Sequence, residues 1–110
     1  MINTMFKIKK DKYRAARGGS SRLLEISCRK CENEILIYQK DGPGSLKRLY
    51  LDRIFAPDNL INLQTLNLKD IPVLKCKKCK EILGIPFIYK KEKRKAFRLF
   101  VDAIIKKVRI

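Results

Sequence analysis

The chain has 110 residues, and its 27 lysine and arginine residues against 11 aspartate and glutamate residues give a formal charge of +16 at pH 7. This length predicts one compact domain, and no apolar run comes near the about 20 residues that span a bilayer. Because histidine is absent, imidazole-based triads, histidine-containing zinc catalysts and histidine pH switches are excluded. The N-terminus lacks the sustained apolar core of a secretory signal, so we expect an intracellular protein, cytoplasmic or, in a eukaryote, nuclear, with no membrane partner.

Residues 1–21 form a basic, poorly patterned N-terminal segment, which we expect to be flexible. Its Gly18-Gly19-Ser20-Ser21 stretch marks the break before the patterned domain, residues 22–110. Two interpretations are open for the segment: a tail that becomes ordered on RNA or DNA, or a frayed terminus.

Beyond that break, short apolar runs bounded by turn residues predict strands over residues 23–27, 34–39 and 82–89. Residues 46–55 fit both a helix face and an alternating strand, and we favour the strand because the neighbouring segments are strands. Residues 60–68 alternate leucine with polar side chains and predict an irregular strand and loop. Residues 96–110 fit the helical and the strand period equally well.

Three segments concentrate the positive charge: residues 7–17, residues 75–80 and residues 90–98. Self-repulsion disfavours a compact chain at this charge, and a polyanion would relieve it, so nucleic acid is the expected partner, RNA before DNA. The alternative is a lysine-rich surface that only keeps the protein in solution. The predicted nucleic-acid contacts are Lys9, Lys10, Lys12, Arg14, Arg17, Lys47, Arg48, Lys77, Lys78, Lys91, Lys93, Arg94 and Lys95.

The four cysteines form the strongest pattern: Cys28-x-x-Cys31, then 44 intervening residues, then Cys76-x-x-Cys79. A spacing of two residues lets both thiolates of a pair face one ion, so two pairs favour a single structural Zn²⁺ with tetrahedral geometry. Four thiolates fill the coordination shell and leave no open position for catalysis. Two disulfides, a redox Cys-x-x-Cys pair and an iron centre on four thiolates are the alternatives.

The stretch Cys76-Lys77-Lys78-Cys79-Lys80-Glu81-Ile82-Leu83-Gly84 and the tail from Arg98 to Ile104 resemble the Yippee family and its relatives, the Mis-eighteen group. The resemblance spans roughly residues 26–108 and is strongest from Cys76 to Ile104. It implies a mainly β, β-tent or zinc-ribbon-like fold, in which two antiparallel sheets join at one zinc. It also implies strands over residues 96–108, a backbone bend at Gly84, and zinc ligation by Cys28, Cys31, Cys76 and Cys79.

The chain departs from the enzymatic and ligand-binding members of the β-tent group. Methionine-R-sulfoxide reductases need a redox cysteine beyond the zinc ligands, and the cereblon type uses a tryptophan cage, whereas this sequence has four cysteines and no tryptophan. A cage built from Tyr38, Tyr50, Phe87, Tyr89 or Phe97 is conceivable, although aromatic residues in strands more often belong to the core.

The turn Gly42-Pro43-Gly44-Ser45-Leu46-Lys47-Arg48 combines glycine-freed amides with a hydroxyl and two cations. It predicts either a phosphate contact or simply a basic hairpin loop. Taken together, the sequence predicts a non-enzymatic structural-zinc module that docks on nucleic acid. A protein-interaction or oligomerisation module of the Yippee type, with an acidic protein or a second copy as partner, is the alternative. No enzyme and no small-molecule substrate are expected, since no spare nucleophile is present.

Overall fold

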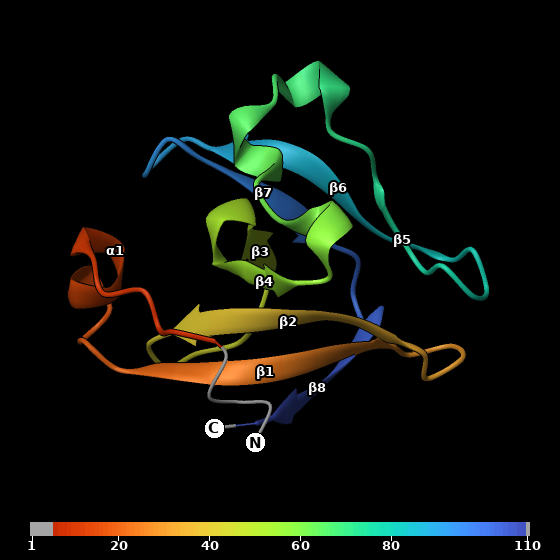
Figure 1. The fold of residues 1–110 in the computed structure, drawn as a ribbon, viewed down its shortest axis with the longest axis horizontal. Coiled ribbons are helices and arrows are strands. Elements are labelled where there is room, and N and C mark those ends of the chain that lie inside the picture. Colours follow the sequence, from red (N-terminus) through yellow and green to blue (C-terminus); the bar gives the residue numbers. More distant parts are fainter. Residues whose placement is uncertain (1–5, 110) are drawn as a thin grey trace.

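The structure is a computed structural model that describes residues 6–109. Two four-stranded antiparallel sheets lie one above the other (Figure 1). The first sheet has the order β4-β2-β1-β8 and the second the order β3-β7-β6-β5. Their strands are β1 (Ser21–Cys28), β2 (Glu34–Asp41), β3 (Arg48–Tyr50), β4 (Ile54–Ala56), β5 (Leu74–Lys75), β6 (Ile82–Tyr89), β7 (Arg94–Leu99) and β8 (Ile104–Val108).

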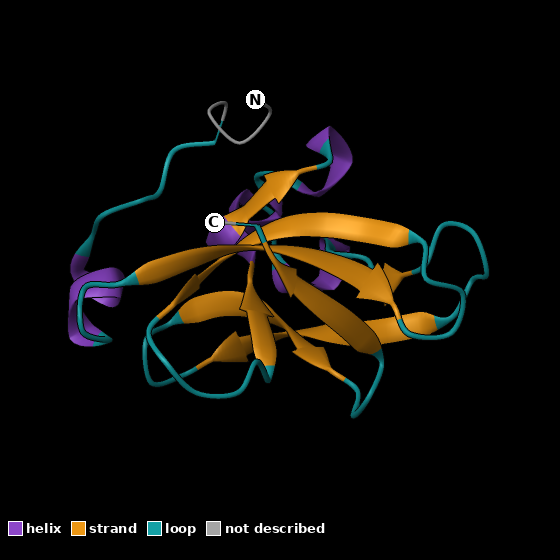
Figure 2. Cartoon of the chain, turned by 90° about the horizontal axis from the view of Figure 1, so that it is seen from below, coloured by secondary structure: helices purple, strands orange, loops and turns teal. Residues whose placement is uncertain are grey.

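The chain passes between the two sheets four times, after β2, β3, β4 and β7. Consecutive antiparallel strands form the hairpin β1–β2 in the first sheet and the hairpins β5–β6 and β6–β7 in the second. The turns of β1–β2 and β5–β6 each carry one cysteine pair. The last strand, β8, returns to pair with β1, with Ile104 opposite Cys28. Helical structure is confined to short segments around this β body (Figure 2).

One apolar core holds the two sheets together. Leu24 and Ile26 of β1, Leu36 of β2, Leu49 of β3 and Phe97 of β7 are each at most 2% exposed and belong to one cluster. At about 1.5–3 kcal/mol per fully buried large apolar side chain, such contacts supply most of the driving force for folding. Two of the four cysteines, Cys28 and Cys76, belong to the same cluster.

The predicted strands over residues 23–27, 34–39 and 82–89 are confirmed by β1, β2 and β6. For residues 96–110 the strand alternative is correct, because the segment contributes part of β7 and all of β8 with a turn between them.

Two central expectations need correction. Residues 46–55 are not one strand, because a 3₁₀ turn at Leu51–Arg53 separates β3 from β4. The strand expected within residues 60–68 is wrong, since this region and its flanks form 3₁₀ turns at Asp58–Leu60, Leu63–Thr65 and Leu68–Asp70. Asn62 has φ +68°, a left-handed conformation that interrupts an extended chain.

The N-terminal segment carries a short helix, α1 (Lys12–Ala16), which the sequence patterns did not indicate. The Asp11 carboxylate caps it by accepting hydrogen bonds from the backbone N–H groups of Tyr13 and Arg14, at 3.1 and 3.2 Å. Asp11 also reaches Arg53, 42 residues along the chain, so α1 is tied to the β body. Residues 1–5 of this segment, and Ile110 of the predicted domain, lie outside the described residues.

Candidate metal centre

The two cysteine pairs meet where the turns of the β1–β2 and β5–β6 hairpins come together. The four sulfur atoms all lie within 4.8 Å of one another. Two separations join the two hairpins, with Cys28 Sγ 3.6 Å from Cys79 Sγ and Cys31 Sγ 3.5 Å from Cys76 Sγ. The structure therefore gathers the four predicted ligands into one cluster.

The two turns have the same backbone geometry. In the first, Cys28 N–H donates to the Asn33 carbonyl at 2.9 Å and Glu32 N–H donates to the Cys28 carbonyl at 2.8 Å. In the second, Cys76 N–H donates to the Glu81 carbonyl at 2.9 Å, and Lys80 N–H donates to the Cys76 carbonyl at 2.9 Å. Glu32 and Lys80 also share a positive φ, +65° and +70°. Each turn thereby points two sulfurs to the same side, which is what a shared ion requires.

The separations fit a tetrahedral ion better than a disulfide. Zn–S bonds of about 2.3 Å place tetrahedral sulfurs about 3.8 Å apart, close to the two separations of 3.5 and 3.6 Å between the hairpins. A disulfide would need about 2.05 Å. The cluster consists of sulfur ligands alone, a donor set suited to zinc or to iron.

The surroundings of the sulfurs favour a thiolate at Cys76, whereas at Cys79 a backbone hydrogen bond from Glu81 is outweighed by burial and the neighbouring thiols, which raise the pKa to about 12. Burial raises the pKa of the Cys76 thiol, but hydrogen bonds from the backbone N–H groups of Cys79 and Lys78 and the neighbouring thiols outweigh this and lower its pKa to about 6. Cys28 and Cys76 are fully buried, whereas Cys31 and Cys79 are partly exposed. Exposed cations follow the first cysteine of each pair, Arg29 and Lys30 in one turn and Lys77 and Lys78 in the other. Their positive charge complements the formal charge of −2 on four thiolates around a divalent ion.

The predicted nucleic-acid contacts fall into two groups by exposure. Side chains of the first group are exposed: Lys9, Lys10, Lys12, Lys47, Lys77, Lys78, Lys91 and Lys93. Those of the second are partly or fully buried and make contacts within the protein: Arg14, Arg17, Arg48, Arg94 and Lys95. Arg94 is only 6% exposed and forms ion pairs with Asp52 and Glu92. The thirteen residues belong to several different elements and loops, so no single strand or turn carries them all.

An ionic network that the sequence analysis missed joins the N-terminal segment to both sheets. At its centre Arg53 is 1% exposed and pairs with Asp11 at 2.7 Å and with Asp41 at 2.9 Å. Asp52 continues the network to Arg94 at 2.8 Å. The one signal in the sequence was an arginine at a position where the alternating pattern of residues 46–55 called for an apolar side chain.

Arginine and aromatic side chains interleave on the second sheet. Arg98 of β7 stacks over Phe87 at 4.6 Å and Arg48 of β3 over Tyr89 at 4.2 Å, measured from the guanidinium carbon to the ring centroid. Phe87, Tyr89 and Arg48 are partly exposed and Arg98 is exposed.

The other aromatic residues of the predicted cage belong to the interior. Tyr38, Tyr50 and Phe97 are at most 7% exposed. The Tyr38 hydroxyl accepts a hydrogen bond from Tyr50 N–H at 2.9 Å, and burial raises its pKa. The side chains that the cage would need are therefore divided between the core and the arginine-covered part of the second sheet.

Comparisons with models of protein families, with curated proteins and with solved structures give no match to this chain. The class of protein is therefore defined by the fold and the cluster alone: a mainly β domain of two antiparallel sheets with four clustered cysteines that can hold one metal ion. The likeness to the Yippee family stays a prediction. Within the part of the chain that the structure describes, no helix has the length and apolar character needed to cross a bilayer.

Proposed function

We propose that this chain is a non-enzymatic module in which one structural Zn²⁺ joins two β-hairpins, and that it works by binding nucleic acid, RNA in preference to DNA. The observation that carries the proposal is the cluster of four cysteine sulfurs within 4.8 Å of one another. A site closed by four protein ligands supports a structural role for the metal, because catalytic zinc keeps a position for water or substrate.

The position of the cluster supports a role in folding. It lies where a turn of the first sheet meets a turn of the second, so an ion bound there links two hairpins that are far apart in the sequence. Structural zinc contributes on the order of 10 kcal/mol to small domains. For a domain of 110 residues this is comparable with the whole stability of a typical protein.

The placement of charge supports nucleic acid as the partner. Several carboxylates are already neutralised inside the protein, since Asp11, Asp41, Asp52 and Glu92 each pair with an arginine. Few carboxylates are thus left to compensate the positive charge of the exposed lysines, which favours a polyanion as the partner. The partly exposed arginine–aromatic pairs on the second sheet offer flat surfaces on which unpaired bases stack.

The metal part of the proposal is tested by elemental analysis of the protein purified without added metal or chelator. We expect one zinc per chain, and replacement by Co²⁺ should give the visible absorption of a tetrahedral four-thiolate site. One iron per chain would identify the site as an iron centre and not a zinc site. The absence of any transition metal would overturn the structural-zinc module.

The partner is tested by fluorescence polarisation with a single-stranded RNA and the DNA of the same sequence across a salt series. We expect binding that weakens steeply as salt rises, with the RNA bound more tightly. Equal affinity for RNA and DNA would contradict the preference alone. No binding of either strand at low salt would reject nucleic acid as the partner.

A protein-interaction or oligomerisation module, as in the Yippee resemblance, is the second candidate. The observation in its favour is a set of exposed apolar side chains on β6 and in the turn after β7: Ile82, Ile85, Ile88, Phe100 and Val101. Sedimentation over a range of protein concentrations tests it. A monomer at every concentration that also captures no acidic protein would count against this candidate.

A further inference from the structure

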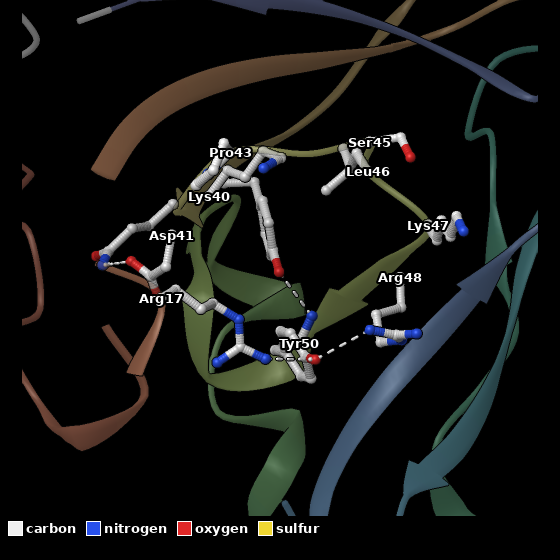
Figure 3. Close-up of a pocket in the computed structure, with 11 residues that line it drawn as sticks. Arg17, Lys40, Asp41, Pro43, Ser45, Leu46, Lys47, Arg48 and Tyr50 are labelled. Atoms are coloured by element: carbon white, nitrogen blue, oxygen red, sulfur yellow. Dashed lines mark hydrogen bonds between the residues drawn. The ribbon is translucent and has the colours of Figure 1, made fainter. Parts of the chain in front are cut away.

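A basic pocket lies between the loop that follows β2, the strand β3 and the N-terminal segment (Figure 3). Its volume is about 350 Å³. Four cations line it, Arg17, Lys40, Lys47 and Arg48, from three separate parts of the chain. Figure 3 shows Arg17 and Arg48 on either side of Tyr50, with Lys47 nearby on the loop.

The loop that forms one wall is fixed in place. Gly42 has φ +74°, and a Cβ atom there would lie 2.7 Å from the backbone oxygen of Arg17, so only glycine fits without displacement. Gly42 N–H donates to the Ser20 carbonyl at 2.9 Å. These contacts hold the loop against the N-terminal segment, and the pocket is therefore present before any ligand arrives.

Two guanidinium groups converge inside the pocket on a single oxygen atom. The Tyr50 hydroxyl accepts from Arg17 Nη2 at 3.0 Å and from Arg48 Nη1 at 3.3 Å (Figure 3). The Arg48 guanidinium is further oriented by the ring of Tyr89, 4.2 Å from its carbon. Like charges held this close repel, and an anion between them would relieve the repulsion.

Within residues 6–109, carboxylates compensate only one of the four cations, Arg17. Glu92 neutralises Arg17 through two hydrogen bonds of 2.9 Å. Asp41 lines the pocket, but its side chain is 4% exposed and accepts from Ser21, Gln39 and Arg53. Among the described residues no carboxylate forms an ion pair with Lys40, Lys47 or Arg48.

The environment of Lys40 agrees with a surplus of positive charge. Burial lowers the pKa of Lys40, and the nearby cations Lys106, Arg22 and Arg17 lower it further, against the opposing effect of Asp41. Its ammonium group donates to the Gly42 carbonyl at 2.7 Å, which places it at the base of the loop. A bound anion would favour the charged form of this lysine.

We propose that this pocket is a subsite for one phosphate group of the bound nucleic acid, an inference that rests on the proposed function. Arg48 and Lys47 donate to the phosphate oxygens, and Lys40 and the exposed hydroxyl of Ser45 complete the set of donors. Arg48 is suited to this role because the Tyr89 ring and the Tyr50 hydroxyl orient its planar fork in advance. A phosphate contact fixes the position of the strand on the protein without reading its sequence.

The first experiment measures the affinity for single-stranded RNA by fluorescence polarisation. The double variant Lys47→Ala/Arg48→Gln is compared with Lys69→Ala/Lys107→Ala, which also removes two positive charges, from exposed positions outside the pocket and outside the predicted contacts. We expect the pocket variant to bind about 10-fold more weakly with every RNA sequence, and its salt slope to fall by about 2. The control should change the affinity by no more than about 3-fold. Equal losses in the two variants would overturn the subsite and leave nucleic-acid binding intact.

A second experiment separates the pocket from the proposed function. Inorganic phosphate is titrated into the ¹⁵N-labelled full chain, and the amide signals of the loop, Gly44 and Ser45, are followed by NMR. Saturable shifts that the single variant Lys47→Glu abolishes support the subsite even if RNA does not bind, and the absence of shifts overturns it. Lys47 is exposed, and unchanged circular dichroism of this variant shows that folding is preserved.

Discussion

Two ends of the molecule hold the same two sheets together by different chemistry. At one end the turns of two hairpins bring four sulfurs within 4.8 Å. At the other, beside α1, Arg53 and Arg94 pair with carboxylates of the N-terminal segment, of β2, of the 3₁₀ turn at Leu51–Arg53 and of the turn between β6 and β7. Figure 1 shows the hairpin turns and α1 at opposite sides of the fold. Under the proposed function the sulfur end would depend on one ion, whereas the ionic end depends on pH and on complete pairing.

The two ends also differ in what their removal leaves behind. Without the proposed ion, the sulfur cluster would be a set of thiols that can be protonated and that do not bind the hairpins to each other. Without Arg53, the carboxylate of Asp41 would stay buried with one fewer partner, because its side chain is only 4% exposed. A buried charge without its counterion is costly. Loss of the ion would therefore remove a connection between the two hairpins, whereas loss of Arg53 would leave the buried charge of Asp41 without its counterion.

Removal of the metal should have the largest effect. Cys76→Ser takes one of four ligands from the centre of the cluster, and we expect loss of the ion together with loss of cooperative thermal unfolding, since a structural zinc contributes on the order of 10 kcal/mol. Thermal unfolding followed by circular dichroism, with elemental analysis of the same sample, measures both. Lys78→Ala, in the same turn but exposed, is the control and should keep metal and fold. A Cys76→Ser protein that lost zinc yet unfolded like the wild type would show that the metal does not stabilise the fold.

Breaking the ionic end comes next. Arg53→Met leaves Asp41 and Asp11 without their guanidinium, and we expect the free energy of unfolding to fall by about 3–5 kcal/mol. Urea denaturation gives the value. Lys30→Ala removes an exposed pair with Glu81, whose side chains are 67% and 50% exposed, and should cost less than about 1 kcal/mol. Similar losses in the two variants would mean that burial adds nothing to the Arg53 pairs.

Acid should weaken the ionic end by a smaller amount. The hydrogen bond from Arg53 lowers the pKa of Asp11 to about 2, so the stability that this carboxylate contributes is complete above about pH 4, its unfolded pKa, and is lost as the pH falls toward 2. Because the Asp11 side chain is 39% exposed, solvent screening reduces the contribution to about 1 kcal/mol.

The measurement for Asp11 is urea unfolding of the wild type and Asp11→Asn between pH 7 and pH 2. Asparagine retains the ability to cap α1, so the variant removes the charge while keeping the cap. The difference between the two proteins should be largest at pH 7 and shrink toward pH 2. A difference that stays constant with pH would assign the effect to something other than the Asp11 charge.

The features that the sequence could predict are those set by residues close together along the chain. The Cys-x-x-Cys pairs and the strands around them are local patterns, and both were predicted correctly, as was the placement of four cysteines in one cluster. The Arg53–Asp11 contact joins residues 42 positions apart, and no spacing along the chain marks it. For the same reason the N-terminal segment was expected to be flexible, although α1 and Asp11 make contacts with the β body.

The central region shows a different limit. Leucine alternating with asparagine, glutamine and threonine over residues 60–68 has the period of a strand. In the structure three of these leucines contact the core from 3₁₀ turns instead, with Leu63 buried and Leu60 and Leu68 packed against the cluster. Burial of apolar side chains determines the conformation of this region, and 3₁₀ turns can bury leucines as well as a strand can. The basic pocket was anticipated only in part: its loop and Arg17 were both predicted as anion contacts, but the sequence does not show that Arg17 lies beside the loop.

The return of β8 to β1 has a consequence for a chain that is still being synthesised. Residues 104–108 complete a sheet whose other strands lie before residue 57, and Cys28 and Cys31 can form the four-sulfur cluster only once Cys79 has been added. A nascent chain on the ribosome therefore carries β1 with an open edge until residues 104–108 emerge. Such edges recruit neighbouring strands, so the pairing of β8 with β1 covers an edge that a second copy of the chain could otherwise join.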